Sequence, residues 1–120
     1  MSELPRRYVI KDSVIDGKTY KTPNGMSSRF NKCYIHLQFF SDDKFENEVR
    51  PTGGTAKIQL SPDGSNFYDL DAGGTIDLST MYSPSYTIPS AASPAEDGSI
   101  TLTSVAGTNV NYFKATFERF

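Results

Sequence analysis

The chain has 120 residues, 22% of them charged and 12% aromatic, and a formal net charge of −2 at pH 7. This length fits one core, so we expect a single domain over residues 1–120. Without a basic surplus to release counterions from phosphates, a general nucleic-acid binder is excluded. No apolar run approaches the length of a membrane span, and MSELPRRYVIKD has no signal-peptide core. We therefore expect cytoplasmic synthesis and no membrane or nucleic-acid partner.

The first predicted elements are two strands around a turn. RYVIKDSVI and KTYKT flank Asp16-Gly17, a dipeptide suited to tight hairpin turns, and so predict a β-hairpin. The next element, CYIHLQFF, is the longest apolar segment, and we expect a central strand covered on both faces. Alternation puts the single cysteine, Cys33, on one face and the single histidine, His36, on the other. A Cys/His catalytic dyad is therefore disfavoured, and Cys33 is expected to be a buried apolar residue.

The segment SDDKFENEVR, residues 41–50, comes nearest to a helix. Ser41 is a candidate N-cap, but only Phe45 and Val49 are apolar, so we expect at most one helical turn. The four acidic side chains of this segment are expected to form a solvated turn, because a glycosidase needs two carboxylates across a cleft.

The remaining elements are short predicted strands separated by turn residues. They are TAKIQL, FYDL, TIDLS, SYTI, SITLTSV and YFKATFERF. SYTI is expected at a sheet edge, because Pro89 follows it. In the last segment Phe113, Ala115 and Phe117 share one face, which is expected to be core. With about eight short strands and no helices for parallel crossovers, the fold class is all-β. We expect a single antiparallel β-sandwich, jelly-roll or immunoglobulin-like, or a flattened barrel.

The stretch KIQLSPDGSNFYDL contains the strongest turn signal in the chain. Pro62 has the φ that a type I turn needs, Asp63 suits the next position, and Gly64 can take positive φ. We therefore interpret Pro62, Asp63 and Gly64 as a structural turn within a hairpin. The alternative is a calcium site using Asp63, Asn66, Asp69 and Asp71. Its spacing differs from an EF-hand loop and lacks the closing Glu, so no metal is expected.

Catalytic motifs are scarce in the sequence. His36 is the only histidine, and the chain contains no G-x-S-x-G, Walker or H-E-x-x-H motif. We expect no enzyme, no catalytic residues and no cofactor. Two aromatic residues in the Ser/Pro-containing stretch 79–98, Tyr82 and Tyr86, are candidates for contact with a protein partner or a glycan. The alternative is that they cap an open end of the core.

Two segments carry a resemblance to a known class of proteins. AKIQLSPDGSNFYDL and the later NYFKATFERF resemble a pattern in small all-β virion structural proteins, decoration or accessory proteins, of tailed bacteriophages. The matching residues are Ser61, Asp63, Gly64, Asn66, Phe67, Leu70, Tyr112, Phe113, Lys114 and Phe117. The resemblance implies a structural role in a virion, in several copies, with no catalytic residues to transfer.

From these observations the predicted function is a non-catalytic virion protein. A head decoration or cement protein that binds the capsid lattice is the leading hypothesis. The alternatives are a tail or baseplate accessory protein and a carbohydrate-binding or adhesion module. The expected location is the virion, and the expected partners are other virion proteins and further copies of the chain, because exposed sheet edges need to be covered or paired.

Overall fold

The computed structural model describes residues 6–22, 32–70, 75–80, 85–87, 92 and 97–119. Ten β-strands lie within these ranges, and every pairing between them is antiparallel. They are β1 (Arg6–Ser13), β2 (Thr19–Lys21), β3 (Lys32–Phe40), β4 (Glu48–Val49), β5 (Gly53–Ser61), β6 (Tyr68–Asp69), β7 (Thr75–Asp77), β8 (Ser85–Thr87), β9 (Asp97–Ala106) and β10 (Tyr112–Arg119). The described part has no helix long and apolar enough to span a membrane.

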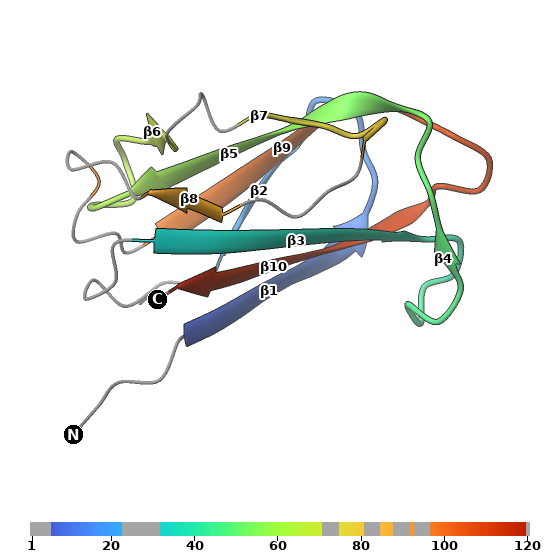
Figure 1. Ribbon diagram of the computed structural model, residues 1–120, viewed down its shortest axis with the longest axis horizontal. Helices are drawn as coiled ribbons and strands as arrows, with labels where there is room; N and C mark the ends of the chain where they lie inside the picture. Colours follow the sequence, from blue (N-terminus) through green and yellow to red (C-terminus); the bar gives the residue numbers. More distant parts are fainter. Residues whose placement is uncertain are drawn as a thin grey trace.

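The strands form two sheets of five strands each, packed as a sandwich (Figure 1). Sheet A has the order β1-β10-β3, with β8 and β4 paired to opposite ends of β3. Sheet B has the order β2-β9-β5, with β7 and β6 paired to opposite ends of β5. The pairs β1–β10, β2–β9, β3–β8 and β5–β7 nest inside one another. This nesting is the jelly-roll arrangement, one of the two sandwich types that the sequence predicts.

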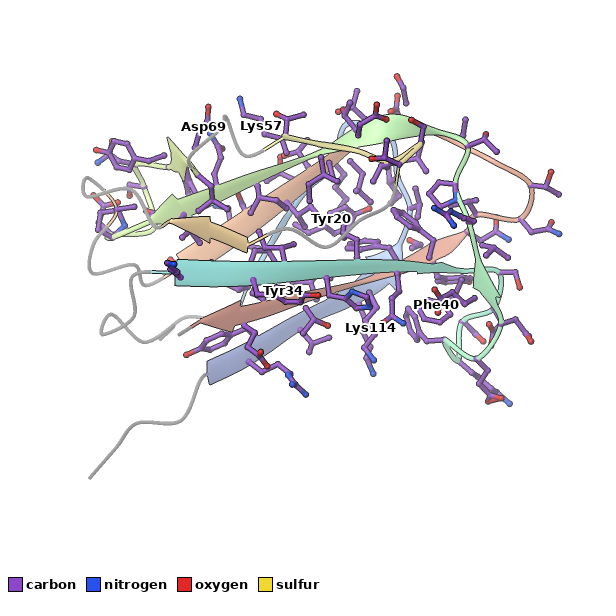
Figure 2. All side chains as sticks on the ribbon, in the orientation of Figure 1. Tyr20, Tyr34, Phe40, Lys57, Asp69 and Lys114 are labelled. Carbon is purple, nitrogen blue, oxygen red and sulfur yellow. The ribbon has the colours of Figure 1, made fainter. Side chains whose placement is uncertain are left out.

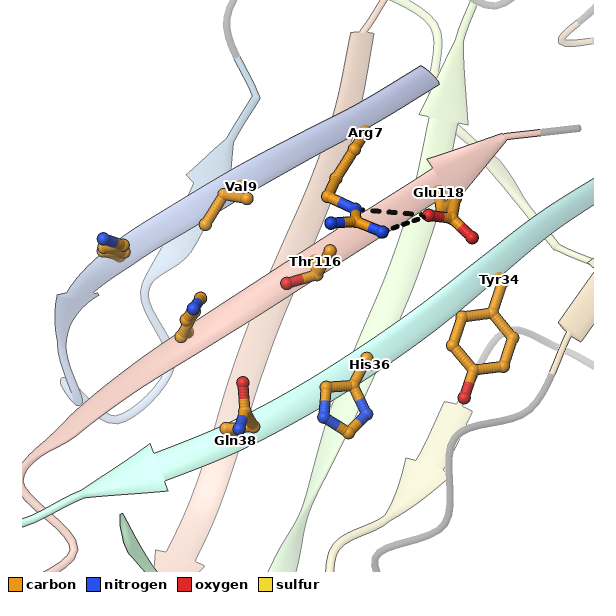
Figure 3. Close-up of a pocket in the computed structure, with 9 residues that line it drawn as sticks. Arg7, Val9, Tyr34, His36, Gln38, Thr116 and Glu118 are labelled. Atoms are coloured by element: carbon orange, nitrogen blue, oxygen red, sulfur yellow. Dashed lines mark hydrogen bonds and ion pairs between the residues drawn. The ribbon is translucent and has the colours of Figure 1, made fainter. Parts of the chain in front are cut away.

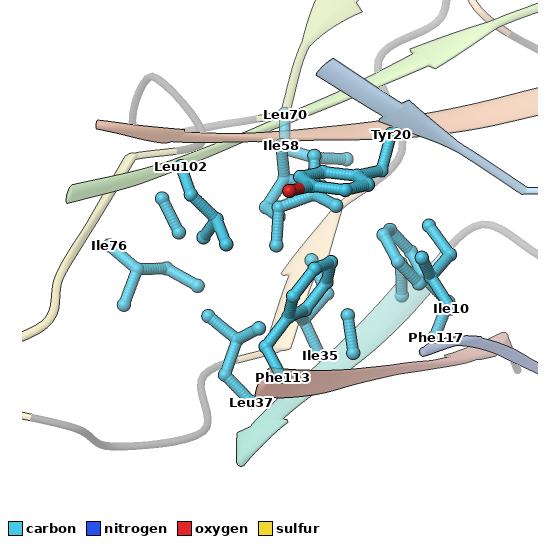
Figure 4. Close-up of a cluster of buried hydrophobic side chains, with 14 of the residues drawn as sticks. Ile10, Tyr20, Ile35, Leu37, Ile58, Leu70, Ile76, Leu102, Phe113 and Phe117 are labelled. Carbon is cyan, nitrogen blue, oxygen red and sulfur yellow. The ribbon is translucent and has the colours of Figure 1, made fainter. Parts of the chain in front are cut away.

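The core lies between the sheets and is built by the alternating inward side chains of the long strands (Figure 4). Phe113 and Phe117 of β10 are fully buried, together with Ala115, so the predicted core face of this segment is confirmed. The ring of Phe113 meets the ring of Tyr20 edge to face, with centroids 4.6 Å apart. Because Phe113 belongs to sheet A and Tyr20 to sheet B, this contact joins the two layers.

The prediction of a hairpin around Asp16-Gly17 is wrong. The chain does reverse there, with Gly17 at φ +76°, but β1 joins sheet A and β2 joins sheet B. The turn is fixed to β9 instead, because Gly17 N–H donates to Leu102 O (2.8 Å) and Ser104 N–H donates to Asp16 Oδ1 (2.6 Å). Turn residues specify that the chain reverses, whereas the pairing of the flanking strands depends on which layer buries each of them.

The segment Ser41–Arg50 contains no helical turn, and it includes the short strand β4. Asp42 closes the loop, since its carboxylate accepts the N–H groups of Glu46 (3.1 Å) and Asn47 (2.8 Å). These hydrogen bonds lower the pKa of Asp42, and the bond from Asn47 has the largest effect. A side chain that accepts hydrogen bonds from these backbone N–H groups offers the chain an alternative to helix, which explains why no helical turn forms here.

Candidate functional site

The outer face of sheet A forms an open concavity of about 620 Å³ (Figure 3). Nine side chains line it, three from each of the neighbouring strands β1, β10 and β3. They are Arg7, Val9, Lys11, Lys114, Thr116, Glu118, Tyr34, His36 and Gln38. The prediction that the segment 33–40 is covered on both faces is therefore wrong. Its inner residues are buried, but Tyr34, His36 and Gln38 are only partly buried and face this concavity.

Strand register arranges these nine side chains in three rows across the sheet. Arg7, Glu118 and Tyr34 form the first row, Val9, Thr116 and His36 the second, and Lys11, Lys114 and Gln38 the third. Each row crosses the strands, so a ligand or partner lying on this face contacts residues that are far apart in the sequence. We call this surface the outer face of sheet A.

Charge is unevenly distributed over the outer face of sheet A. In the first row the Arg7 guanidinium donates to Glu118 Oε2 through Nε (3.2 Å) and through its terminal nitrogen (2.7 Å). In the third row Lys11 and Lys114 are cross-strand neighbours, and like charges in such positions repel unless something between them is negative. The face therefore has three basic side chains and one acidic one in a chain whose net charge is −2. Such a surface favours an anionic partner.

An aromatic cluster closes one end of the outer face of sheet A. Phe40 follows Gln38 on this face of β3 and is nevertheless buried, because the ring of Phe45 covers it at a centroid distance of 5.5 Å. Phe45 also packs on Tyr112 at 6.0 Å, and Lys11 Nζ lies 5.5 Å from its ring centroid. Figure 2 shows Phe40 at one end of β3 and Tyr34 toward the other. The loop closed by Asp42 therefore positions a wall of this surface.

The predicted turn at residues 62–64 is a structural element, though wider than a tight turn. β5 and β6 pair as the predicted hairpin, with Gln59 opposite Asp69, and residues 62–67 connect them. Asp63 Oδ1 accepts the N–H groups of Ser65 and Asn66, both at 2.8 Å. Asp63 Oδ2 accepts from Asn66 Nδ2, also at 2.8 Å. These hydrogen bonds lower the pKa of Asp63, and the bond from Asn66 N–H has the largest effect. Both carboxylate oxygens of Asp63 therefore accept hydrogen bonds from its own loop.

The other residues of the calcium alternative are not brought together with Asp63. Asp69 lies on β6, where it accepts from Gln59 Nε2 (2.8 Å) and lies 3.6 Å from Lys57 Nζ (Figure 2). Asp71 lies outside the described residues. Among the residues that the structure describes, no group of three or more His, Cys, Asp or Glu side chains has the arrangement of a metal site.

The candidate contact residues Tyr82 and Tyr86 are only partly placed. Tyr82 lies outside the described residues. The backbone of Tyr86 belongs to β8 and pairs with Cys33 at the edge of sheet A, as the edge prediction for SYTI requires. Cys33 is fully buried and His36 lies on the outer face, so the predicted separation of the two side chains is confirmed.

Sequence reasoning did not find the outer face of sheet A. Each of its strands carries an alternating pattern, and the outward residues of each are visible in it. The signal that was missing is the order β1-β10-β3, which brings the start, the end and the middle of the chain side by side. Alternation within a strand says nothing about its neighbours.

The strand order defines the class of the protein as a jelly-roll β-sandwich. No protein-family model matches the chain, and no curated protein matches it. Among solved structures the chain is similar to the SPBc2 prophage-derived protein YomS, with a TM-score of 0.51 and 9% sequence identity. The match covers 98% of this chain and 97% of that one. At this identity the likeness shows a shared fold along the whole length.

Proposed function

We propose that this protein is a non-catalytic structural component of a bacteriophage virion, and specifically a head decoration protein that binds the capsid lattice. The observation that carries the proposal is the full-length likeness of its jelly roll to a prophage-derived protein. The resemblance of residues 56–70 and 111–120 to small virion proteins supports the same conclusion.

The outer face of sheet A is the surface that we assign to the lattice contact. It is concave, it lies on three long strands that hold it rigid, and its basic excess suits an acidic surface of the capsid protein. Lys11 and Lys114 are the residues on which this contact would depend most. Their charges lie next to each other on neighbouring strands, whereas Arg7, the third basic residue on this face, is already paired with Glu118.

Mass spectrometry of purified particles from the phage or prophage that encodes the chain tests the function. The chain should be present in particles, and in the head fraction after heads and tails are separated. Recovery in the tail fraction would instead support the tail or baseplate alternative. Absence from particles, while the chain is abundant in the producing cells, would overturn the virion proposal.

Charge reversal tests the assigned surface. Lys11→Glu with Lys114→Glu should abolish incorporation of the protein into heads. The matched control is Lys21→Glu with Lys57→Glu, which changes the net charge equally at exposed positions of sheet B and should leave incorporation unchanged. Equal incorporation of both double variants would show that the lattice contact lies elsewhere.

A carbohydrate-binding or adhesion module is the second candidate, and one observation favours it. Tyr34, His36 and Gln38 line the same concavity from one strand and offer an aromatic ring beside hydrogen-bonding groups. A glycan array with the wild-type protein and with Tyr34→Ala tests this candidate. Binding that Tyr34→Ala removes would support it, and an array without any bound glycan would exclude it.

A further inference from the structure

β1 is the terminal strand of sheet A, and its outer backbone edge pairs with no other described strand. Val14 N–H donates to Asn111 O (2.9 Å), which fixes the even-numbered residues as those whose backbone groups point toward β10. On the opposite side, Ser13 O accepts the hydroxyl of Tyr20 (2.6 Å). The N–H and C=O groups of the odd-numbered residues of β1 therefore point away from the sheet.

The available part of this edge is symmetric about Val9. Ser13 is already satisfied within the chain, because its N–H donates to Asp12 Oδ1 (2.7 Å) and its C=O accepts from Tyr20. What remains is the edge formed by Arg7, Val9 and Lys11, whose N–H and C=O groups have no partner among the described residues. An unpaired and regular edge of this kind is a template for another strand.

The side chains of this edge suit a second copy of the same strand. Val9 is 37% exposed and is one of the three exposed large hydrophobic residues in the described part of the chain. Arg7 is paired with Glu118 at 2.7 Å, so the ion pair that faces Lys11 of a second copy carries no net charge. A groove of about 500 Å³ separates β1 from β2, so sheet B leaves the edge of β1 accessible.

We propose that β1 of one copy pairs with β1 of a second copy, antiparallel and on a two-fold axis at Val9, so that two copies of sheet A become one continuous sheet. An axis normal to the sheet keeps both outer faces on the same side and makes the contact isologous. Val9 then lies opposite Val9, and Arg7 opposite Lys11, on the outer face. On the inner face Tyr8 lies opposite Ile10. Every available backbone group of Arg7, Val9 and Lys11 gains a partner.

This pairing deepens the proposed function, and its biological use rests on that function, because it doubles the concave surface offered to a lattice. Its test is independent, since it uses the purified protein alone. Failure of the pairing leaves the particle experiment untouched, and absence of the chain from particles leaves the pairing untouched.

Site-specific cross-linking tests the register. Residues in a hydrogen-bonded antiparallel pair have Cα atoms roughly 5.5 Å apart, within the range of a disulfide. Oxidised Val9→Cys should form a covalent dimer by itself. Arg7→Cys and Lys11→Cys should each remain uncrosslinked alone and form a dimer when mixed. The wild type is the control, because its only cysteine, Cys33, is buried and should give no covalent dimer.

Sedimentation equilibrium of variants without added cysteine tests the association itself. The wild type should be a dimer, and Val9→Lys should weaken it at least about tenfold by placing two like charges on the axis. Thr116→Lys is the matched control. Thr116 lies opposite Val9 on β10, the neighbouring strand within the same sheet, so this variant should remain dimeric. A monomeric wild type at millimolar concentration, or a dimer that Val9→Lys leaves intact, would overturn the proposal.

Discussion

Gly17 and Gly64 have nearly the same backbone conformation, at φ +76° and +78°, in different surroundings. A Cβ added at Gly17 would meet no atom within 4 Å. A Cβ added at Gly64 would lie 2.8 Å from Asp97 Oδ2, on the strand that pairs with β5. Gly17 is therefore required only by its backbone conformation, whereas Gly64 is required by its conformation and by close packing.

The two alanine substitutions should separate these contributions. Gly17→Ala should lower the free energy of unfolding by about 1–2 kcal/mol, the cost of a left-handed conformation for a residue with a Cβ. Gly64→Ala should lower it further, and Asp97→Ser should reduce the difference by removing the contacting oxygen. Urea unfolding of the single and double variants measures this. Equal losses at the two glycines would show that Asp97 moves aside without cost.

Asp63 makes the stability of the loop depend on pH. Its hydrogen bonds hold the pKa of the carboxyl below the ordinary value of 3.8, so the folded state binds the proton less readily than the unfolded state. A lowered pKa stabilises the fold above 3.8, and this contribution is lost as the pH falls from there toward the folded-state pKa. The pKa values of Asp42 and Asp77 are also lowered, so they contribute in the same direction.

Asp63→Asn, which keeps the shape and removes the charge, should isolate the Asp63 contribution. The variant should be less stable than the wild type at neutral pH, and the gap should narrow as the pH falls below 3.8. Urea midpoints at a series of pH values provide the measurement. A gap that stays constant over the whole series would mean that the charge of Asp63 contributes nothing.

At the scale of the element, the loop Ser41–Asn47 shows how a strained residue is retained. Phe45 has φ +57°, a conformation that residues with a Cβ rarely adopt. Its ring packs edge to face on Phe40 and Tyr112, and Asp42 holds the loop closed around it. The ring contacts and the carboxylate bonds offset the strain of the backbone.

Two substitutions at Phe45 should reveal that strain. Phe45→Ala and Phe45→Gly both lose the ring contacts, but only glycine adopts positive φ freely. Phe45→Gly should therefore be more stable than Phe45→Ala by about 1 kcal/mol, the reverse of the order at ordinary positions. Chemical denaturation of both variants tests the order. An alanine variant at least as stable as the glycine variant would mean that the loop relaxes when the ring is removed.

At the scale of the whole molecule, the sandwich depends on contacts that join the two sheets. Phe113 is fully buried and meets Tyr20 across the layers, and the hydroxyl of Tyr20 accepts Ile15 N–H at 3.0 Å. Burial, the largest cause, raises the pKa of Tyr20. One pair of rings thus connects β10 with β2 and with the turn that leads into β2.

Phe113→Ala should cost about 3–5 kcal/mol, because it removes buried surface and leaves a cavity between the layers. That loss is a large part of the stability of an ordinary domain, about 5–15 kcal/mol. Phe113→Leu keeps most of the volume and should cost much less. Urea unfolding compares the two variants, and a loss below about 1 kcal/mol for Phe113→Ala would show that the layers close over the gap.

Structural features that depend on residues close together in the sequence could be predicted from it. Alternation identified the inward face of β10, because successive side chains of a strand point to opposite faces. The same alternation separated Cys33 from His36, and the Pro-Asp-Gly stretch identified the hairpin of β5 and β6. For residues 41–50 the sequence allowed at most one helical turn, and none forms because the capture of backbone donors by Asp42 competes with helix at the same residues.

The sequence by itself determined the all-β class, the buried face of the principal strands and the places where the chain reverses, since each depends on local sterics and on periodicity. Only the tertiary structure decided that β1 and β2 part into different sheets, and that β1, β10 and β3 lie side by side. Those decisions created the outer face of sheet A and left the edge at Val9 open. The physical reason is that strand pairing is non-local. Backbone hydrogen bonds are the same for every residue, so the strand that lies next to another is selected by burial of the whole core.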